Sequence, residues 1–452
     1  METRIILEND CHAGKHYLSH CDARNEHFYF SYQGKSYDME NRETVLELQK
    51  LLVKKADYES AKTFNDFLIR VTRLKGLDHW LFYPSELQIE HTNRCNARCI
   101  MCGHYNADHR KCRDIDPAMV RKLEPMFPFC RYIGLHGYGE PFLTRRLPDY
   151  FKLYKKYGIR LYANTNLSYM PEEYIPYIRD MFDELNVSCE SVNKETYEKI
   201  RKGLSFERFV TNIERVHSSC PHVRLNFFIV IMRQNLLELP AIVDFAADHG
   251  FSSVQFTEMI AMEANDNYGD NPRLFPNLFS EKMKEAILRA KERKMHLQYP
   301  AESLLDREDT KEKMLELERI GTENKRRTSG SPDKKENLLF DRKKISAEAC
   351  KGNLHSCKGI CDVFSSQLYC SLDGKYAACC VDGYHYTEKI GDVQTMEQYW
   401  ESDSVRLIRS CFQKGELPGI CYECNFILLN QLKFLEVDDR QKYQNMVNAE
   451  VL

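Results

Sequence analysis

Three cysteines in one short stretch are the residues of this sequence best suited to chemistry. They follow the pattern Cys95-x3-Cys99-x2-Cys102, so a single loop can bring three thiolates to one metal site. No fourth cysteine follows at a matching spacing, and three protein ligands leave one coordination position open for a reacting molecule. The alternative is a zinc ion completed by His91 or His104, because structural zinc takes four protein ligands.

A second group of cysteines lies further along the chain, where nine of the eighteen fall between Cys350 and Cys424. Around the Asp373-Gly374 pair the sequence predicts two strands joined by a turn, and a Cys-x2-Cys pair follows later. A hairpin that presents cysteine, together with such a pair, offers four ligands to one metal group. This region therefore predicts a second metal site, for which structural zinc is the alternative.

The composition limits the class of protein. The chain has 452 residues, a formal net charge of −3, and no stretch close to the ~20 apolar residues of a membrane span. This charge gives no sign of a nucleic-acid or membrane partner. The first ten residues lack the apolar core of a signal peptide, so we expect a cytoplasmic protein. In that reducing compartment, eighteen cysteines favour metal sites over disulfides.

The order of the predicted elements between residues 83 and about 258 is typical of an α/β fold. Short apolar runs alternate with longer amphipathic ones, which indicates parallel βα units. The predicted strands are 87–90, 132–136, 160–163, 184–188, 224–230 and 253–256, and the predicted helices are 117–125, 147–157, 172–182, 193–217 and 237–249. In α/β barrels the active site lies at the C-terminal ends of the strands, and Cys95 comes just after the first strand.

The cysteine pattern and its setting resemble those of the radical S-adenosylmethionine (SAM) superfamily. The resemblance rests on the first strand, the His91-Thr-Asn-Arg lead-in, the three cysteines, and Met101 where the family has a bulky residue. It implies a partial, TIM-like (β/α)6 barrel with a [4Fe-4S] cluster held by Cys95, Cys99 and Cys102. SAM is the second cofactor implied, and it would chelate the fourth iron.

The turn after the second predicted strand resembles the Gly-Gly-Glu motif of the same family, which contacts the amino group of SAM. Gly137, Gly139 and Glu140 are the matching residues, although Tyr138 stands where the family has the first glycine of the pair. Glycine allows the backbone to approach a ligand closely, and a carboxylate accepts hydrogen bonds from a cationic amine. The resemblance therefore implies that this turn binds SAM.

Three further positions match SAM-binding residues of the family. Asn166 follows the third strand in a polar turn, and Ser188 ends the fourth strand, although Glu190 and Ser191 depart from the family's pattern there. Arg201 lies in the predicted helix 193–217, where the family has an arginine that pairs with the SAM carboxylate. Arginine suits that role because its planar guanidinium binds a carboxylate with two hydrogen bonds.

The second cysteine group resembles the SPASM/twitch extension of radical SAM enzymes. This resemblance implies one auxiliary [4Fe-4S] cluster bound by Cys361, Cys379, Cys421 and Cys424, with Cys380 as the alternative to Cys379. The first strands and helices of the chain, predicted at 27–32, 41–52 and 58–75, are loosely similar to leader-peptide recognition modules. A cap packed on the barrel is the alternative. The expected regions are a small N-terminal α+β domain at 1–82, the barrel at 83–304, a charged linker at 305–348, and a Cys-rich cluster domain at 349–452.

The implied activity is reductive cleavage of SAM to a 5′-deoxyadenosyl radical, which abstracts hydrogen from an unactivated carbon. Relatives with this extension often crosslink or epimerise ribosomally made peptides, and others oxidise or epimerise amino sugars or cyclitols. The N-terminal region favours a peptide. Flavodoxin or ferredoxin is the expected electron donor, and a non-catalytic zinc or iron–sulfur scaffold is the alternative from another class.

Overall fold

The computed structural model describes residues 27–75, 77, 80–104, 111–259, 268–272, 275–300, 343–344, 366–377, 388–389, 395–403, 405–406, 409 and 416–417. The predicted auxiliary ligands Cys361, Cys379, Cys380, Cys421 and Cys424 lie outside these residues, as does nearly all of the predicted linker 305–348.

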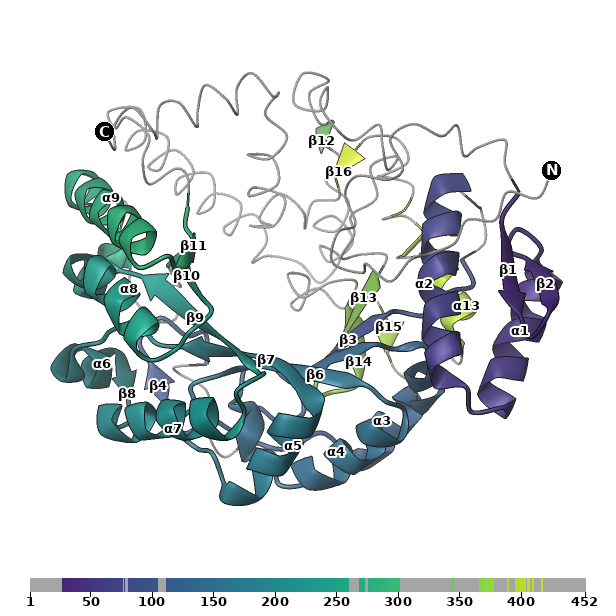
Figure 1. Cartoon of the computed structure of the whole chain (residues 1–452), viewed down its shortest axis with the longest axis horizontal. Coiled ribbons are helices and arrows are strands. Elements are labelled where there is room, and N and C mark those ends of the chain that lie inside the picture. Colours follow the sequence, from purple (N-terminus) through teal and green to yellow (C-terminus); the bar gives the residue numbers. More distant parts are fainter. Residues whose placement is uncertain are drawn as a thin grey trace, which may run out of the picture.

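A curved and mostly parallel sheet forms the centre of the fold, with the strand order β11-β10-β9-β7-β6-β5-β3-β13-β14-β15 (Figure 1). Six of its parallel strands are the predicted ones, namely β3 (Glu86–Ile89), β5 (Tyr132–Gly134), β6 (Arg160–Thr165), β7 (Phe182–Ser188), β9 (Arg224–Ile231) and β10 (Ser253–Glu258). β11 (His296–Gln298) adds another parallel strand beside β10. The sheet stays open among the described residues, so the prediction of a partial TIM-like barrel is confirmed.

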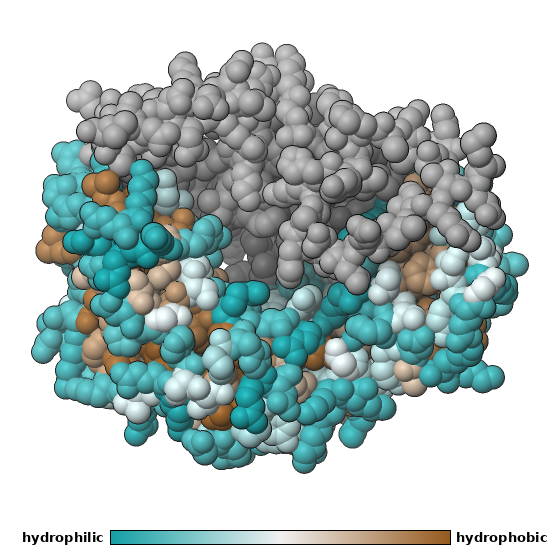
Figure 2. All heavy atoms as spheres, in the orientation of Figure 1, coloured by the Kyte–Doolittle hydropathy of each residue, from teal (hydrophilic) through white to brown (hydrophobic). Residues whose placement is uncertain are grey.

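Helices cover the convex face of the sheet, where the strand side chains are apolar and buried (Figure 1). Leu87, Ile133, Leu161, Leu185 and Leu225 are at most 1% exposed and alternate with polar residues along their strands. The helices are α3 (Pro117–Leu123), α4 (Leu147–Lys156), α5 (Ile175–Met181), α6 (Lys194–Ile200), α7 (Phe206–Ser219), α8 (Leu239–Asp248) and α9 (Pro276–Glu292). On the face shown in Figure 2, the described surface is mainly hydrophilic, with hydrophobic residues in separate spots.

The prediction of one helix over 193–217 is wrong, because the chain forms two helices there, α6 and α7. They are separated by the short strand β8 (Arg201–Lys202), which pairs with β4 (Arg98–Cys99) in the cysteine loop. Gly203 follows with φ +95°, a backbone conformation that other residues rarely adopt. Both helices bury apolar residues at helical spacing, so the sequence pattern runs through the break without a visible interruption.

The N-terminal residues form a compact cap on the barrel. It consists of β1 (Tyr29–Tyr32), β2 (Lys35–Asp38), α1 (Arg42–Lys54) and α2 (Tyr58–Lys75). Asn41, the predicted N-cap residue of α1, accepts a hydrogen bond from Thr44 N at 3.1 Å. The side chain of Asn65 in α2 donates to Tyr83 O and accepts from Tyr83 N, both at 2.8 Å, and Lys62 donates to Gly158 O at 2.6 Å. These bonds fix α2 to the barrel.

Residues from beyond position 365 extend the same sheet. β13 (Gln367–Cys370) lies parallel to β3, and β14 (Lys375–Ala377) and β15 (Glu388–Lys389) continue in antiparallel order. α13 (Met396–Trp400) packs against the segment that leads into β3, where Trp400 Nε1 donates to Phe82 O at 2.9 Å. The sheet therefore runs across the domain boundary expected at residue 349. A separate pair joins β12 (Lys343–Lys344) to β16 (Glu416–Leu417).

None of the described helices combines the length and the apolar character that crossing a membrane requires.

Candidate active site

Residues 92–94 lead from β3 into the cysteine loop and are held in place by bonds to residues 113–114. Asn93 N donates to Arg113 O at 3.1 Å. The Asp114 carboxylate accepts from Thr92 Oγ1 at 2.7 Å and from Arg94 Nε at 3.2 Å. These contacts fix the direction in which the chain leaves β3. The cysteines therefore follow the C-terminal end of the first barrel strand, as predicted.

Cys99 is held by β8 through both backbone and side chain. The two short strands are antiparallel with Cys99 opposite Arg201, and Arg201 Nη1 donates to Cys99 Sγ at 3.7 Å. The other edge of the guanidinium pairs with Glu190, with Nη2 donating to Oε1 at 2.9 Å and Nε against Oε2. All three residues are buried, with exposed fractions of 8% for Cys99, 5% for Arg201 and 1% for Glu190.

The cysteine thiols lie in surroundings that favour their neutral form. Burial is the main cause that raises the pKa of Cys95 to about 11 and that of Cys99 to about 12, and neighbouring thiols act in the same direction. Arg201 opposes this effect at both thiols. A bound metal group would hold these thiols as thiolates, because cationic metal deprotonates a coordinating thiol.

The cysteine thiols of the loop form the donor set for the predicted metal group. Cys95, Cys99 and Cys102 are close enough to influence one another electrostatically. Zinc needs its sulfur ligands about 2.3 Å from a single point, whereas a four-iron cluster binds each cysteine at a different iron.

His91 is not available as a metal ligand, so that part of the zinc alternative is wrong. Its Nδ1 lies 2.8 Å from Ile89 O and its Nε2 lies 2.7 Å from the Tyr154 hydroxyl, which uses both ring nitrogens. Burial lowers the pKa of His91 to about 4. The other predicted zinc ligand, His104, lies beside the loop, where its backbone N–H donates to Cys102 Sγ at 3.4 Å.

Glu140 lies fully inside the protein next to the cysteine loop. Its Oε1 accepts from Thr165 Oγ1 at 2.7 Å and its Oε2 accepts from Asn166 N at 2.8 Å. Burial raises the pKa of Glu140 to about 7, although these hydrogen bonds work in the opposite direction. Gly139 packs against the loop so closely that a Cβ atom there would lie 2.7 Å from Arg94 O. The turn and the cysteine loop therefore form one unit.

Asn166 joins the third strand to the cysteine loop. Its side-chain amide donates to Asn96 Oδ1 at 3.0 Å, and Asn96 donates to Ser168 Oγ at 2.7 Å. Asn96 and Ser168 were not predicted as site residues. The position of Asn96 between two of the cysteines is the only sequence signal for it, because its partners lie about seventy residues away.

The fourth strand brings Ser188 and Glu190 to the same end of the sheet. Ser188 is the last residue of β7 and is half-buried. Two residues later Glu190 turns inward to pair with Arg201. Sequence reasoning treated Glu190 only as a departure from the family pattern, whereas it is the buried counter-ion that fixes the arginine.

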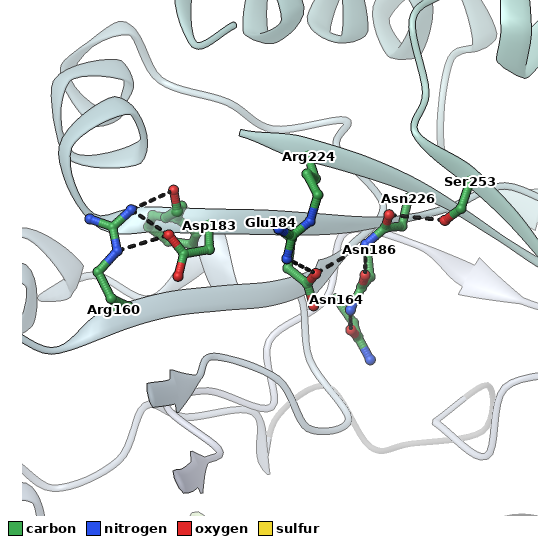
Figure 3. Close-up of polar contacts among 9 residues, drawn as sticks. Arg160, Asn164, Asp183, Glu184, Asn186, Arg224, Asn226 and Ser253 are labelled. Atoms are coloured by element: carbon green, nitrogen blue, oxygen red, sulfur yellow. Dashed lines mark hydrogen bonds and ion pairs between the residues drawn. The ribbon is translucent and has the colours of Figure 1, made fainter. Parts of the chain in front are cut away.

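A ladder of polar side chains crosses the concave face of the sheet (Figure 3). Asn186 donates to Asn164 Oδ1 at 2.8 Å, Asn226 donates to Asn186 Oδ1 at 3.0 Å, and Ser253 donates to Asn226 Oδ1 at 2.9 Å. These residues come from four neighbouring strands, β6, β7, β9 and β10. The concave face is thus polar and uncharged along this line.

Two arginines beside the ladder are paired with carboxylates (Figure 3). Arg160 donates to Asp183 Oδ1 through Nε at 2.9 Å and Nη2 at 2.6 Å. Arg224 donates to Glu184 Oε2 at 3.0 Å. Their positive charge is therefore balanced within the sheet.

Comparisons with known proteins agree with this site. Residues 89–246 match the model of the radical SAM superfamily. A probable GTP 3′,8-cyclase from Methanocaldococcus jannaschii is 28% identical over 209 residues, which cover 45% of this chain and 68% of that protein. Streptococcus suis SuiB bound to the precursor peptide SuiA has a similar fold, with a TM-score of 0.52, 12% identity, and coverage of 80% of this chain and 75% of SuiB.

A third similar structure is native anSMEcpe with bound AdoMet, with a TM-score of 0.50 and 15% identity over 80% of this chain and 99% of that one. The family's cofactors are a [4Fe-4S] cluster and SAM. The cysteine loop and the glycine turn both lie within residues 89–246, on the open parallel sheet. Residues 89–246 of this chain therefore form a radical SAM domain.

Proposed function

We propose that this protein is a radical SAM enzyme that modifies a peptide. The observation that carries the proposal is the loop of Cys95, Cys99 and Cys102 at the end of β3, packed against the turn of Gly139 and Glu140. Cys95, Cys99 and Cys102 would hold a [4Fe-4S] cluster, which when bound would supply the electron for reductive cleavage of SAM to methionine and a 5′-deoxyadenosyl radical able to take a hydrogen atom from the substrate.

The residues around the loop have separate tasks in this proposal. Gly139 brings the backbone close to the loop, and Glu140 accepts a hydrogen bond from the SAM amino group. Asn166 joins the turn of Gly139 and Glu140 to the cysteine loop, because it bonds to both Glu140 and Asn96. Ser188 offers a hydroxyl at the end of the fourth strand. Arg201 acts mainly on the loop itself, because Glu190 already occupies one edge of its guanidinium and Nη1 points to Cys99.

A polar substrate fits the concave face of the sheet. The amide groups of Asn164, Asn186 and Asn226 can exchange hydrogen bonds with a peptide backbone, which also carries donors and acceptors without charge. The fold is shared with SuiB, whose structure contains a precursor peptide. The β1–β2 hairpin in the N-terminal cap is a two-stranded sheet, and strand edges bind extended peptides through backbone hydrogen bonds.

A nucleotide is the second candidate, because the relative from M. jannaschii is a probable GTP 3′,8-cyclase. A triphosphate needs several cations that are not already neutralised. On the described concave face, Arg160 and Arg224 are paired with Asp183 and Glu184. These two arginines begin β6 and β9, at the opposite end of the strands from the cysteine loop, so the substrate test below has to separate a nucleotide from a peptide. An amino sugar or cyclitol remains the alternative for a small neutral substrate.

The chemistry is tested by anaerobic reconstitution with iron and sulfide, followed by incubation with SAM and dithionite. The wild type should release 5′-deoxyadenosine, and a variant with Ala at positions 95, 99 and 102 should release none. If Cys361, Cys379, Cys421 and Cys424 hold an auxiliary cluster, that variant should keep about half of the wild-type iron. Wild-type product from the triple variant would refute the proposal, and stoichiometric zinc would refute the auxiliary cluster.

The substrate class is tested by incubating the active enzyme with short peptides encoded beside its gene, with GTP, or with amino sugars. A mass change in one peptide alone would support the proposal, and a GTP product would refute it. Tyr29 on the hairpin is 55% exposed. Tyr29→Ser should raise KM for the full-length peptide and leave KM unchanged for a peptide without its leader.

A further inference from the structure

A buried carboxylate links two turns that lie far apart in the sequence. Glu90 follows β3 and is 5% exposed. Its Oε1 accepts from Tyr138 N at 2.9 Å, in the turn that precedes Glu140. Its Oε2 accepts from Leu372 N at 3.1 Å, in the turn between β13 and β14. One side chain thus bridges segments that are 48 and 282 residues away from it.

The first turn is built around this side chain. A Cβ atom at Gly137 would overlap Glu90 Cγ and would lie 2.7 Å from Glu90 Oε1. Only glycine lets the turn settle on the carboxylate at this distance. This explains why glycine occurs at position 137, one residue earlier than in the family's usual pair, and why Tyr138 can occupy the next position with its backbone N–H on Glu90.

The second turn is fixed to the same place by independent contacts. Glu90 N donates to Cys370 O at 3.0 Å, which continues the pairing of β3 with β13. Gly374 has φ +70° and packs under Met119 of α3, where a Cβ atom would lie 2.9 Å from the sulfur. Asp373 forms an ion pair with Arg113, which belongs to the segment beside the cysteine loop. The C-terminal turn is therefore part of the barrel mouth.

We propose that Glu90 is a positioning residue that couples residues 366–377 to the SAM-facing turn 137–140, so that this C-terminal segment holds the SAM site in its binding geometry. This inference rests on the proposed function. Each carboxylate oxygen accepts one backbone N–H, and bonds from N–H to an ionised carboxylate are among the stronger hydrogen bonds in proteins. Losing either bond releases one turn from the other.

Glu90→Gln is the sharpest test because it keeps the shape of the side chain. A glutamine has one carbonyl oxygen, so its amide nitrogen must face one of the two backbone N–H donors. The matched control is Glu86→Gln, which neutralises a carboxylate four residues earlier, at the start of β3. Glu86 bonds to Gln367 of β13 and to Tyr162 and has no bond to the 137–140 turn.

Amide hydrogen exchange, followed by mass spectrometry on peptides covering 135–140 and 368–375, should be about tenfold faster in Glu90→Gln than in the wild type. The SAM Kd of the reconstituted protein, measured by equilibrium dialysis, should rise by about the same factor at unchanged cluster content. Glu86→Gln should keep wild-type exchange at 135–140 and a wild-type SAM Kd.

Unchanged exchange and affinity in Glu90→Gln would overturn the inference. So would faster exchange across the whole chain in both variants, because that would show a general loss of stability. A wild type that does not bind SAM, with exchange still faster at the two turns in Glu90→Gln, would refute the proposed function and leave the link between the turns standing.

Discussion

At the scale of single residues, Arg201 is the side chain whose replacement says most about the site. It pairs with Glu190 inside the protein, and removing one partner of a buried ion pair leaves an uncompensated charge. We expect Arg201→Met to lower the free energy of unfolding by about 3–5 kcal/mol in urea titrations. The double variant Glu190→Leu/Arg201→Met should regain most of this loss. Equal stability of the wild type and the single variant would contradict the buried pair.

Arg201 should also influence the reduction potential of the cluster. Hydrogen bonds to the sulfur ligands of an iron–sulfur cluster help to set its reduction potential, and Arg201 Nη1 is such a donor to Cys99 Sγ. In the reconstituted double variant we expect reduction to become about tenfold less favourable, a shift on the order of 59 mV to lower potential. An EPR-monitored redox titration measures this. Arg98→Met, at an exposed position beside Cys99, is the control.

His91 should make the stability depend on pH. Its pKa is lowered from 6.5 to about 4 in the folded protein, so the unfolded chain takes up the proton first as the pH falls. Stability is therefore lost below the unfolded pKa. Between pH 7 and pH 5 the wild type should lose about 2 kcal/mol more than His91→Gln. Parallel slopes in urea titrations of the two proteins at both pH values would contradict this.

The residues that could be predicted from the sequence are those whose signal is local. The three cysteines and the glycine turn before Glu140 are each contained within eight or fewer positions. Asn96 was missed because its partner Asn166 is 70 residues away. Glu190 is only 11 residues from Arg201, but their pairing depends on the break between α6 and α7, which no periodicity reveals.

At the scale of elements, the contact between the glycine turn and the cysteine loop should tolerate no added atom. Gly139→Ala places a Cβ atom 2.7 Å from Arg94 O and 2.9 Å from Asn93 C, and a backbone cannot move aside as a flexible side chain does. We expect at least tenfold less 5′-deoxyadenosine in a timed assay. Gly269→Ala, where nothing lies within 4 Å, is the control and should keep wild-type activity.

The strands were easier to predict than the helices because each strand is short and bounded by loops. All six barrel strands occur within two residues of their predicted limits. The helix at 193–217 was predicted as continuous because α6 and α7 place apolar residues such as Tyr197 and Phe209 against the same core. The break contains Gly203 at φ +95° and the N-cap residue Ser205, and the pairing of β8 with β4, a contact across about a hundred residues, holds it in place.

At the scale of the whole molecule, the two ends of the described chain meet on one side of the barrel. Arg42 of α1 pairs with Glu397 of α13 at 2.7 Å, and β13 pairs with β3. Sequence patterns placed these parts in separate regions, at 1–82 and 349–452. Sequence patterns could not show that these two regions contact each other, because hydrophobic periodicity identifies an element but not the distant element that packs on it.

The junction between α13 and the segment that leads into β3 also gives the molecule a built-in optical signal. The chain has two tryptophans, Trp80 and Trp400, and both are there, with ring centroids 5.2 Å apart and exposed fractions of 4% and 1%. All tryptophan emission therefore originates from one point. Without any label, a change in the emission wavelength reports whether α13 stays packed on the segment that leads into β3 as cofactors are added or removed.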